Sequence, residues 1–327
     1  MQRLFIINSK GSKRTAQFWR RHGQALAEGL PGAEQLAVDA RSLAGLESYQ
    51  EYDQLILVGD DSFFHLAINQ LHGNLLEKES RQHYAFLPDH RESALGSSLE
   101  LPSSLKSHLE LLRRSPTIPF DLVRCDCIGT QGTPARRLIL NDALIRLPQM
   151  KLPLVLRTVV QWFRTYSGIF QRKAPSKVTL FEHGEKRFEG EFVCAIMLLG
   201  NKITDGPRLN SKRRFLRKRF AYYQLNANDL LDYTTALPRF LDEDALDRGD
   251  DPNIFQGNFT DLDIRGLGEE NRIIADGVPI GRLPASFTLL PKALSVVSPM
   301  TPVQKLEPSR QKLAKASKPV GNLKTGA

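Results

Sequence analysis

The chain has 327 residues, 41% of them hydrophobic and 25% charged, which excludes collagen-like, mucin-like and globally disordered proteins. Its length favours two domains that share a medium-sized core. The net charge of +9 comes from 45 lysines and arginines against 36 acidic residues, and the excess of positive charge is concentrated in two segments of the C-terminal half.

The N-terminal third alternates between short apolar runs and helical spacing. Strands are predicted at residues 4–7, 35–38, 55–58 and 84–87, and helices at 13–30, 42–49, 62–71 and 103–114. The third strand is apolar throughout, which is typical of a strand buried on both faces of a parallel sheet. Alternating strands and helices indicate an open, Rossmann-like α/β sheet, whose ligands bind beyond the carboxyl ends of the strands. A site is therefore expected in the loops after Ile7, Val58 and Leu87.

Beyond Pro116 the pattern changes to strands separated by turns. These strands are predicted at residues 121–128, 137–145, 177–181, 188–198, 219–225, 259–264 and 287–290, with one helix at 152–170. The pattern predicts an α/β domain over residues 1–115, a β-rich, β-sandwich-like domain over 116–300, and a tail over 301–327. The tail is basic and poor in large apolar residues, so we expect it to be flexible.

Residue types that commonly carry chemistry form few recognisable patterns. The three cysteines, Cys125, Cys127 and Cys194, lack the spacing of a four-ligand zinc site and predict reduced thiols in a cytoplasmic protein. The seven histidines form no ligand-spaced pair and are expected at the surface or its boundary. The longest apolar run, residues 192–199, is too short for a membrane-spanning helix, and the apolar stretch near the start is too short for a signal-peptide core.

The basic segment, residues 208–219, carries seven cations and no acid. Its basic residues are Arg208, Lys212, Arg213, Arg214, Arg217, Lys218 and Arg219. Such a segment can face anionic lipid headgroups, bind nucleic-acid phosphates, or form a merely solvated loop. No recognition module or aromatic platform accompanies the charges, so no specific nucleic acid is expected. The protein is predicted to be cytoplasmic, with contact at the inner face of the membrane as the role of this segment.

The segment over residues 53–71 combines a buried strand, a polar turn and a helix. It resembles the part of the diacylglycerol kinase and sphingosine kinase superfamily in which a strand ends in G-G-D-G-T and its helix ends in N-G-L. Gly59, Asp61, Asn69 and Leu71 match that pattern without a gap. The residues that depart from it are Asp60, Ser62 and Phe63.

Three further stretches match the same superfamily in the same order. Residues 4–11 resemble its opening strand and N-P-x-[AS]-G turn, with Asn8 kept and Ser9 in place of proline. Residues 88–97 stand where the family has P-x-G-T-G-N-D and keep only the proline. Residues 257–299 resemble its closing β unit, with Asp276 and the following glycine kept and the glutamate of D-G-E lost. The resemblance spans roughly residues 1–300.

This resemblance implies an ATP-dependent kinase that phosphorylates a lipid hydroxyl, with ATP and Mg²⁺ as cofactors where turnover survives. Asp61 and Asp276 match its catalytic aspartates, and Asp61 would hold the metal ion. The nucleotide-binding positions that the resemblance implies are Asn8, Ser9, Gly11, Gly59, Asp61 and Ser62. The other interpretation makes both aspartates turn residues, and Asp276 with the following glycine is a common turn dipeptide.

The altered turn after the third strand predicts weakened nucleotide binding. Glycines let backbone amides approach an anion closely and permit positive φ, and the side chains of Asp60 and Ser62 obstruct both. Asp60 also adds a carboxylate where nucleotide phosphates would lie. The alternative function is therefore a catalytically inactive protein of lipid-kinase fold that binds a lipid or an anionic membrane surface. The sequence leaves the lipid and the oligomeric state open.

Overall fold

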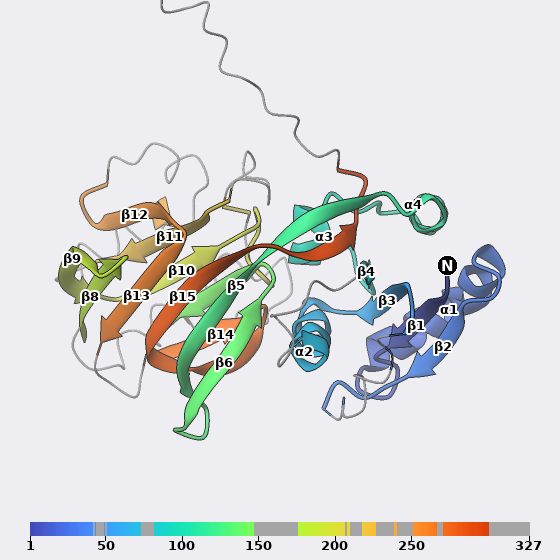
Figure 1. Ribbon diagram of the computed structural model, residues 1–327, viewed down its shortest axis with the longest axis horizontal. Coiled ribbons are helices and arrows are strands. Elements are labelled where there is room, and N and C mark those ends of the chain that lie inside the picture. Colours follow the sequence, from blue (N-terminus) through green and yellow to red (C-terminus); the bar gives the residue numbers. More distant parts are fainter. Residues whose placement is uncertain are drawn as a thin grey trace, which may run out of the picture.

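The computed structural model describes residues 1–41, 43, 49, 51–72, 82–146, 176–206, 208–209, 218–226, 239–240, 251–266 and 271–300. These residues form one mixed sheet, and the helices lie beside its strands from the N-terminal third of the chain (Figure 1). The predicted helix at 152–170, most of that at 42–49, and the tail lie outside the described residues.

The N-terminal part of the sheet is parallel, as predicted. Its strands are β1 (Arg3–Ile7), β2 (Glu34–Ala37), β3 (Gln54–Gly59) and β4 (His83–Pro88), in the order β2-β1-β3-β4. Every residue of β3 is buried, which confirms that the strand is covered on both faces. Leu55 and Leu57 join one core, while Ile56 and Val58 join another. Alternate side chains of a strand point to opposite faces, so the sheet separates these two cores.

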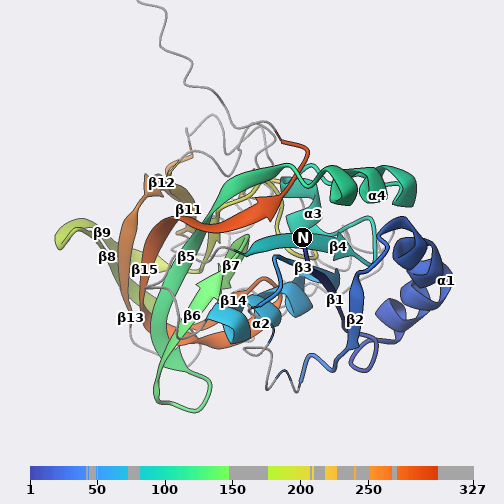
Figure 2. The same ribbon diagram turned by 45° about the vertical axis from the view of Figure 1, so that its right-hand side comes forward.

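Helices cover both faces of this parallel sheet (Figure 2). They are α1 (Lys13–Gly29), α2 (Asp61–His72), α3 (Ala94–Ser98) and α4 (Leu105–Arg114). α1 packs against α4 on one face, and α2 contacts β3 and β6 on the other. The short helix α3 was not predicted, because five residues are too few to show a helical period. In the part of the chain that the structure describes, no helix combines the length and apolar character needed to cross a membrane.

The C-terminal half is built almost entirely of antiparallel strands, which confirms the predicted fold class. They are β5 (Thr117–Gly129), β6 (Pro134–Ile139), β7 (Asp142–Ile145), β8 (Ser176–Glu182), β9 (Glu185–Phe192), β10 (Cys194–Leu198), β11 (Phe220–Leu225), β12 (Ile254–Phe259), β13 (Asp261–Gly266), β14 (Arg272–Ala275) and β15 (Val278–Val297). All three cysteines are buried and free of disulfide bonds, as expected.

The long strand β15 connects the two halves. It runs antiparallel to β5 along most of its 20 residues, and near its end Ser295 and Val296 pair in parallel with β4. The two predicted domains therefore share one continuous sheet (Figure 1). Sequence reasoning placed only residues 287–290 in this strand, because its proline and glycine residues interrupt the alternating pattern.

Two predicted strands are each divided in the structure. Residues 137–145 form β6 and β7 with a break at Leu140 and Asn141, and residues 188–198 form β9 and β10 with a break at Val193. The first break has a clear cause. The amides of Leu140 and Asn141 donate to the carboxylate of Asp276 instead of continuing a ladder.

Candidate functional site

The loops after β1, β3 and β4 meet at one edge of the parallel sheet, where the sequence predicted a site. The amide of Asn8 donates to the carbonyl of Val58 at 3.1 Å, and that of Asp89 to the carbonyl of Gly59 at 2.9 Å. Three segments distant in sequence are thus held side by side. The positions that the resemblance implies for nucleotide and metal lie on or beside these loops.

Asp276 occupies a two-residue turn between β14 and β15. Its φ is 47° and that of Gly277 is 82°, so both residues adopt the positive φ that tight hairpin turns require. A side chain in place of Gly277 would be strained, and its Cβ would lie 2.8 Å from the Ser62 hydroxyl. The turn therefore packs directly against the loop that follows β3.

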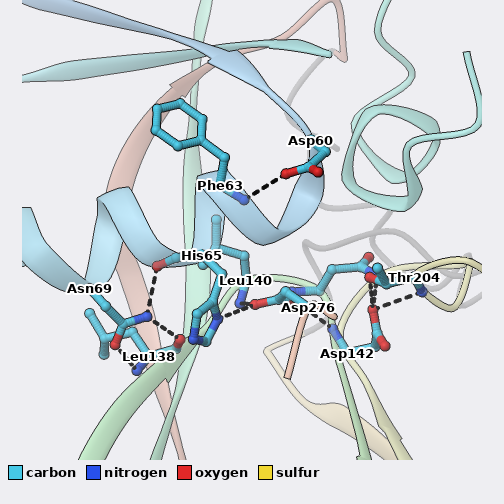
Figure 3. Close-up of polar contacts among 10 residues, drawn as sticks. Asp60, Phe63, His65, Asn69, Leu138, Leu140, Asp142, Thr204 and Asp276 are labelled. Atoms are coloured by element: carbon cyan, nitrogen blue, oxygen red, sulfur yellow. Dashed lines mark hydrogen bonds and ion pairs between the residues drawn. The ribbon is translucent and has the colours of Figure 1, made fainter. Parts of the chain in front are cut away.

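The carboxylate of Asp276 is fully engaged by donors of the protein itself (Figure 3). Its Oδ1 accepts hydrogen bonds from the amides of Asn141 at 2.8 Å and Asp142 at 3.0 Å. Its Oδ2 accepts one from the Leu140 amide at 2.9 Å and lies 2.9 Å from Nδ1 of His65. Asp276 is only 1% exposed. This carboxylate thus holds the β6–β7 connection and offers no free oxygen to a substrate.

Two side chains of α2 attach that helix to the C-terminal half. His65 is 1% exposed and reaches Asp276. The expectation that the histidines lie at the surface or its boundary is wrong for this residue and also for His72 and His108, which are buried. One turn later, the Asn69 amide group pairs with the backbone of Leu138, donating at 2.8 Å and accepting at 2.8 Å. His65 and Asn69 are four residues apart, so both lie on one face of α2. This spacing is the feature of the sequence that could have predicted their shared role.

Asp61, the other surviving aspartate, holds the start of α3. Its Oδ1 accepts from the Ser93 hydroxyl, and its Oδ2 accepts from the Ala94 amide at 2.8 Å. Burial raises the pKa of Asp61 to about 6, against the opposing effect of the Ser93 hydrogen bond. A Mg²⁺ ligand needs an ionised oxygen directed at the ion, whereas both oxygens of Asp61 are directed at the β4–α3 loop.

Asp142 is a buried acid beside Asp276 that sequence reasoning missed. Its Oδ1 accepts from the Thr204 amide at 3.0 Å and from the Asn141 side chain at 2.7 Å, while its buried Oδ2 has no described hydrogen-bond partner. Burial, followed by the charge of Asp276, raises the pKa of Asp142 to about 8. The carboxyl group is therefore mainly neutral at pH 7, with Oδ2 available to carry the proton. The sequence motifs do not include Asp142, because it lies inside the strand predicted at residues 137–145.

The turn after β3 is filled by its own side chains. Oδ1 of Asp60 accepts from the Phe63 amide at 2.9 Å and thereby caps α2. Phe63 is fully buried, and a Cβ at Gly59 would lie 2.6 Å from its ring. Ser62 contacts the turn at Gly277. Asp60 and Phe63 thus make contacts within the fold at positions where the family pattern has glycine and threonine.

The predicted nucleotide positions after β1 also hold parts of the protein together. Asn8 is 4% exposed, and its Oδ1 accepts from the Ala40 amide at 3.0 Å. The Ser9 amide donates to the Ile7 carbonyl at 2.7 Å. A side chain at Gly11 would collide with Asn8 and Asp39. These contacts fix the β1–α1 loop to the end of β2.

The residues of this region do not fit Mg²⁺ and the phosphates of ATP. Among the described residues, no group of three or more His, Cys, Asp or Glu side chains is arranged to hold a metal ion. Asp61 and Asp276 are occupied by internal donors, and Asp60 adds negative charge to the turn.

The basic segment is described only at its ends. Arg208, Lys218 and Arg219 are exposed, and the Arg208 guanidinium donates to the Ser97 hydroxyl at 2.9 Å. The remaining four basic residues lie outside the described residues: Lys212, Arg213, Arg214 and Arg217. The structure thus places one end of the segment against α3.

Comparison with known proteins identifies the fold. No family model and no curated protein matches the sequence. Among solved structures, one described as a "putative diacylglycerol kinase" from Bacillus anthracis str. Sterne superimposes with a TM-score of 0.68 at 17% identity, covering 91% of this chain and 96% of that one. A second, described in the same words, gives 0.65 at 16% identity, with 91% and 97% covered. The chain has the fold of these proteins, as its sequence motifs predicted.

Proposed function

We propose that this chain is a lipid-binding protein with the fold of a lipid kinase that does not transfer phosphate. The observation that carries the proposal is the engagement of Asp61 and Asp276, both of whose carboxylates accept hydrogen bonds from buried groups of the protein. A structural role for Asp61 and Asp276 is compatible with the replacement of the neighbouring glycines by Asp60 and Ser62. Phosphate transfer would need both the acids and the close approach of backbone amides that glycines permit.

The chemistry of a kinase needs acidic oxygens that are free to act. A general base must be within hydrogen-bond reach of the hydroxyl whose proton it takes. For Asp276 to do so, it would have to release the amides of Leu140, Asn141 and Asp142, which its carboxylate now satisfies. Each buried amide left without a partner costs about 1–3 kcal/mol. That cost favours the closed arrangement over a catalytic one.

Two observations support a lipid or an anionic membrane surface as the partner. The two solved structures of the same fold are each described as a "putative diacylglycerol kinase", a name that states a lipid substrate. Arg208, Lys218 and Arg219 are exposed, and each cation near an anionic surface contributes about 1 kcal/mol. The protein would therefore act at the membrane surface.

Thermal unfolding with ATP and Mg²⁺, together with vesicle sedimentation, tests this function. A ligand that binds the native state raises the melting temperature, so we expect no shift with ATP and Mg²⁺. We expect salt-sensitive sedimentation with phosphatidylserine-containing vesicles, because screening weakens such contacts.

A charge-matched pair of variants makes the sedimentation test specific. Changing Arg208, Lys218 and Arg219 to Ser should weaken vesicle binding. Changing Lys10, Lys13 and Lys106 to Ser removes the same charge from exposed positions elsewhere and should have little effect. A melting shift with ATP and Mg²⁺, or equal losses in the two variants, would contradict the proposal.

A further inference from the structure

A cavity of about 510 Å³ lies beside the candidate site, on the face of the parallel sheet that carries α1 and α4. Its walls come from α1, the end of β4, α3, and the loop that leads into α4. This volume is within the range of small-molecule sites in proteins. Neither Asp61 nor Asp276 lines it, and Ser93, which donates to Asp61, forms part of its wall.

Two arginines from separate elements give the cavity positive charge. Arg21 projects from α1 and Arg91 from the loop after β4, and neither forms an ion pair within the part of the chain described here. The lining also contains one acid, Asp89, whose carboxylate is 1% exposed. It accepts from the Thr15 hydroxyl at 2.7 Å and lies 2.9 Å from Nδ1 of His90. Asp89 is thus already paired, while the two arginines are free to bind an anion.

The remaining walls provide hydroxyl groups and an apolar surface. The hydroxyl groups belong to Ser93, Ser97, Ser103 and Ser104. The apolar surface includes Phe18, Leu101 and Leu105, and the Phe18 ring packs against His22 with centroids 5.0 Å apart. A site with apolar walls and a few convergent polar groups is typical of a small organic ligand.

We propose that this cavity binds a phosphomonoester that carries an apolar substituent. Arg21 and Arg91 bind the phosphate, and the substituent lies against Phe18 and the neighbouring leucines. A carboxylate has two oxygens, which one guanidinium satisfies with its two parallel donors, whereas a phosphate has three oxygens to share between two guanidinium groups. The site uses neither Asp61 nor Asp276, so it does not depend on whether the chain transfers phosphate.

Calorimetric titration with phenyl phosphate tests the proposal, with benzoate and inorganic phosphate as comparison ligands. We expect phenyl phosphate to bind at least about tenfold more tightly than either, which corresponds to about 1.4 kcal/mol. Benzoate lacks the third oxygen, and inorganic phosphate lacks the apolar group. Equal affinity for benzoate and phenyl phosphate, or no measurable binding, would overturn the proposal.

Matched variants connect that binding to the cavity. Changing both Arg21 and Arg91 to Gln should weaken phenyl phosphate at least about tenfold, and both residues are exposed, so the fold should be unaffected. The control changes Arg20 and Arg114 to Gln, because both are exposed, neither lines the cavity, and the change removes the same charge. Equal effects of the two changes would overturn the assignment.

A final arm distinguishes a soluble ligand from a lipid headgroup. Vesicles containing phosphatidic acid present the same phosphomonoester at a membrane surface. Sedimentation with these vesicles that is lost in the Arg21→Gln, Arg91→Gln variant would support the site and assign it to a lipid headgroup. Binding of phenyl phosphate without such sedimentation would support a soluble phosphomonoester. Sedimentation and titration both unchanged in the variant would overturn the proposal.

Discussion

Asp61 and Asp276 both match acidic positions of the family pattern, but their carboxylates connect different parts of the fold. Asp276 connects segments far apart in sequence, because its carboxylate contacts α2 through His65 and the three amides between β6 and β7. Asp61 connects the start of α2 to the start of α3, about thirty residues later. Under the proposed function, both acids stand at positions of a catalytic pattern and stabilise the fold, each by joining a different pair of segments. This difference predicts that the two acids contribute unequally to the free energy of unfolding.

The largest effect is expected from Asp276→Ala. The change leaves the amides of Leu140, Asn141 and Asp142 buried without their acceptor. With about 1–3 kcal/mol for each buried unsatisfied group and partial relaxation, the free energy of unfolding should fall by about 3–5 kcal/mol. Urea denaturation measures this loss. Asp276→Asn, which keeps one acceptor oxygen, should lose less, and an unchanged midpoint in the Ala variant would refute the structural role.

A smaller loss is expected from Asp61→Ala. The carboxylate acts as a cap for α3, and deletion of a capping side chain costs about 1–2 kcal/mol. Burial already raises the pKa of Asp61 to about 6, so the cost of desolvation offsets part of what its hydrogen bonds contribute. A loss equal to that of Asp276→Ala, measured by the same denaturation, would break the comparison between the two turns.

The third effect is a slope with pH rather than a single loss, and it concerns the neighbouring Asp142. Its pKa is raised to about 8 in the folded protein, against about 4 in an unfolded chain. The folded state thus binds more protons between these values, and stability falls as pH rises through that range, by at most about 1.4 kcal/mol per pH unit for one proton. Asp142→Asn cannot titrate and should show a shallower decline between pH 6 and pH 8. Parallel pH profiles of the two proteins would show that Asp142 does not carry this proton.

Much of the fold could be predicted from the sequence, because local patterns determine it. The uniformly apolar strand at residues 55–58 and the periodic helix over 13–30 have clear signals, and both are present. The path of β15 into the parallel sheet could not be predicted, since the pairing of Ser295 with His83 depends on long-range register. The same holds for the contact between His65 and Asp276, which are 211 residues apart.

The sequence indicated which loops form the candidate site, but not the hydrogen-bond partners of the side chains there. The motifs placed Asn8, Gly59 and Asp61 on loops that do meet at one sheet edge. What each side chain does there depends on its hydrogen-bond partners, such as Ala40 for Asn8 and Ala94 for Asp61. These partners are backbone amides, which almost every residue has, so the residue types in the sequence do not reveal them. A motif can therefore indicate the place of an acid but not whether its oxygens are free.

Phosphate transfer from labelled ATP to diacylglycerol in mixed micelles with Mg²⁺ tests the central claim most directly. The wild-type protein should transfer no more label than Asp276→Asn or a blank without protein, because the carboxylate of Asp276 is held by the protein's own amides. Transfer by the wild type that Asp276→Asn abolishes, in a variant that stays folded by circular dichroism, would contradict the account and make Asp276 a catalytic base.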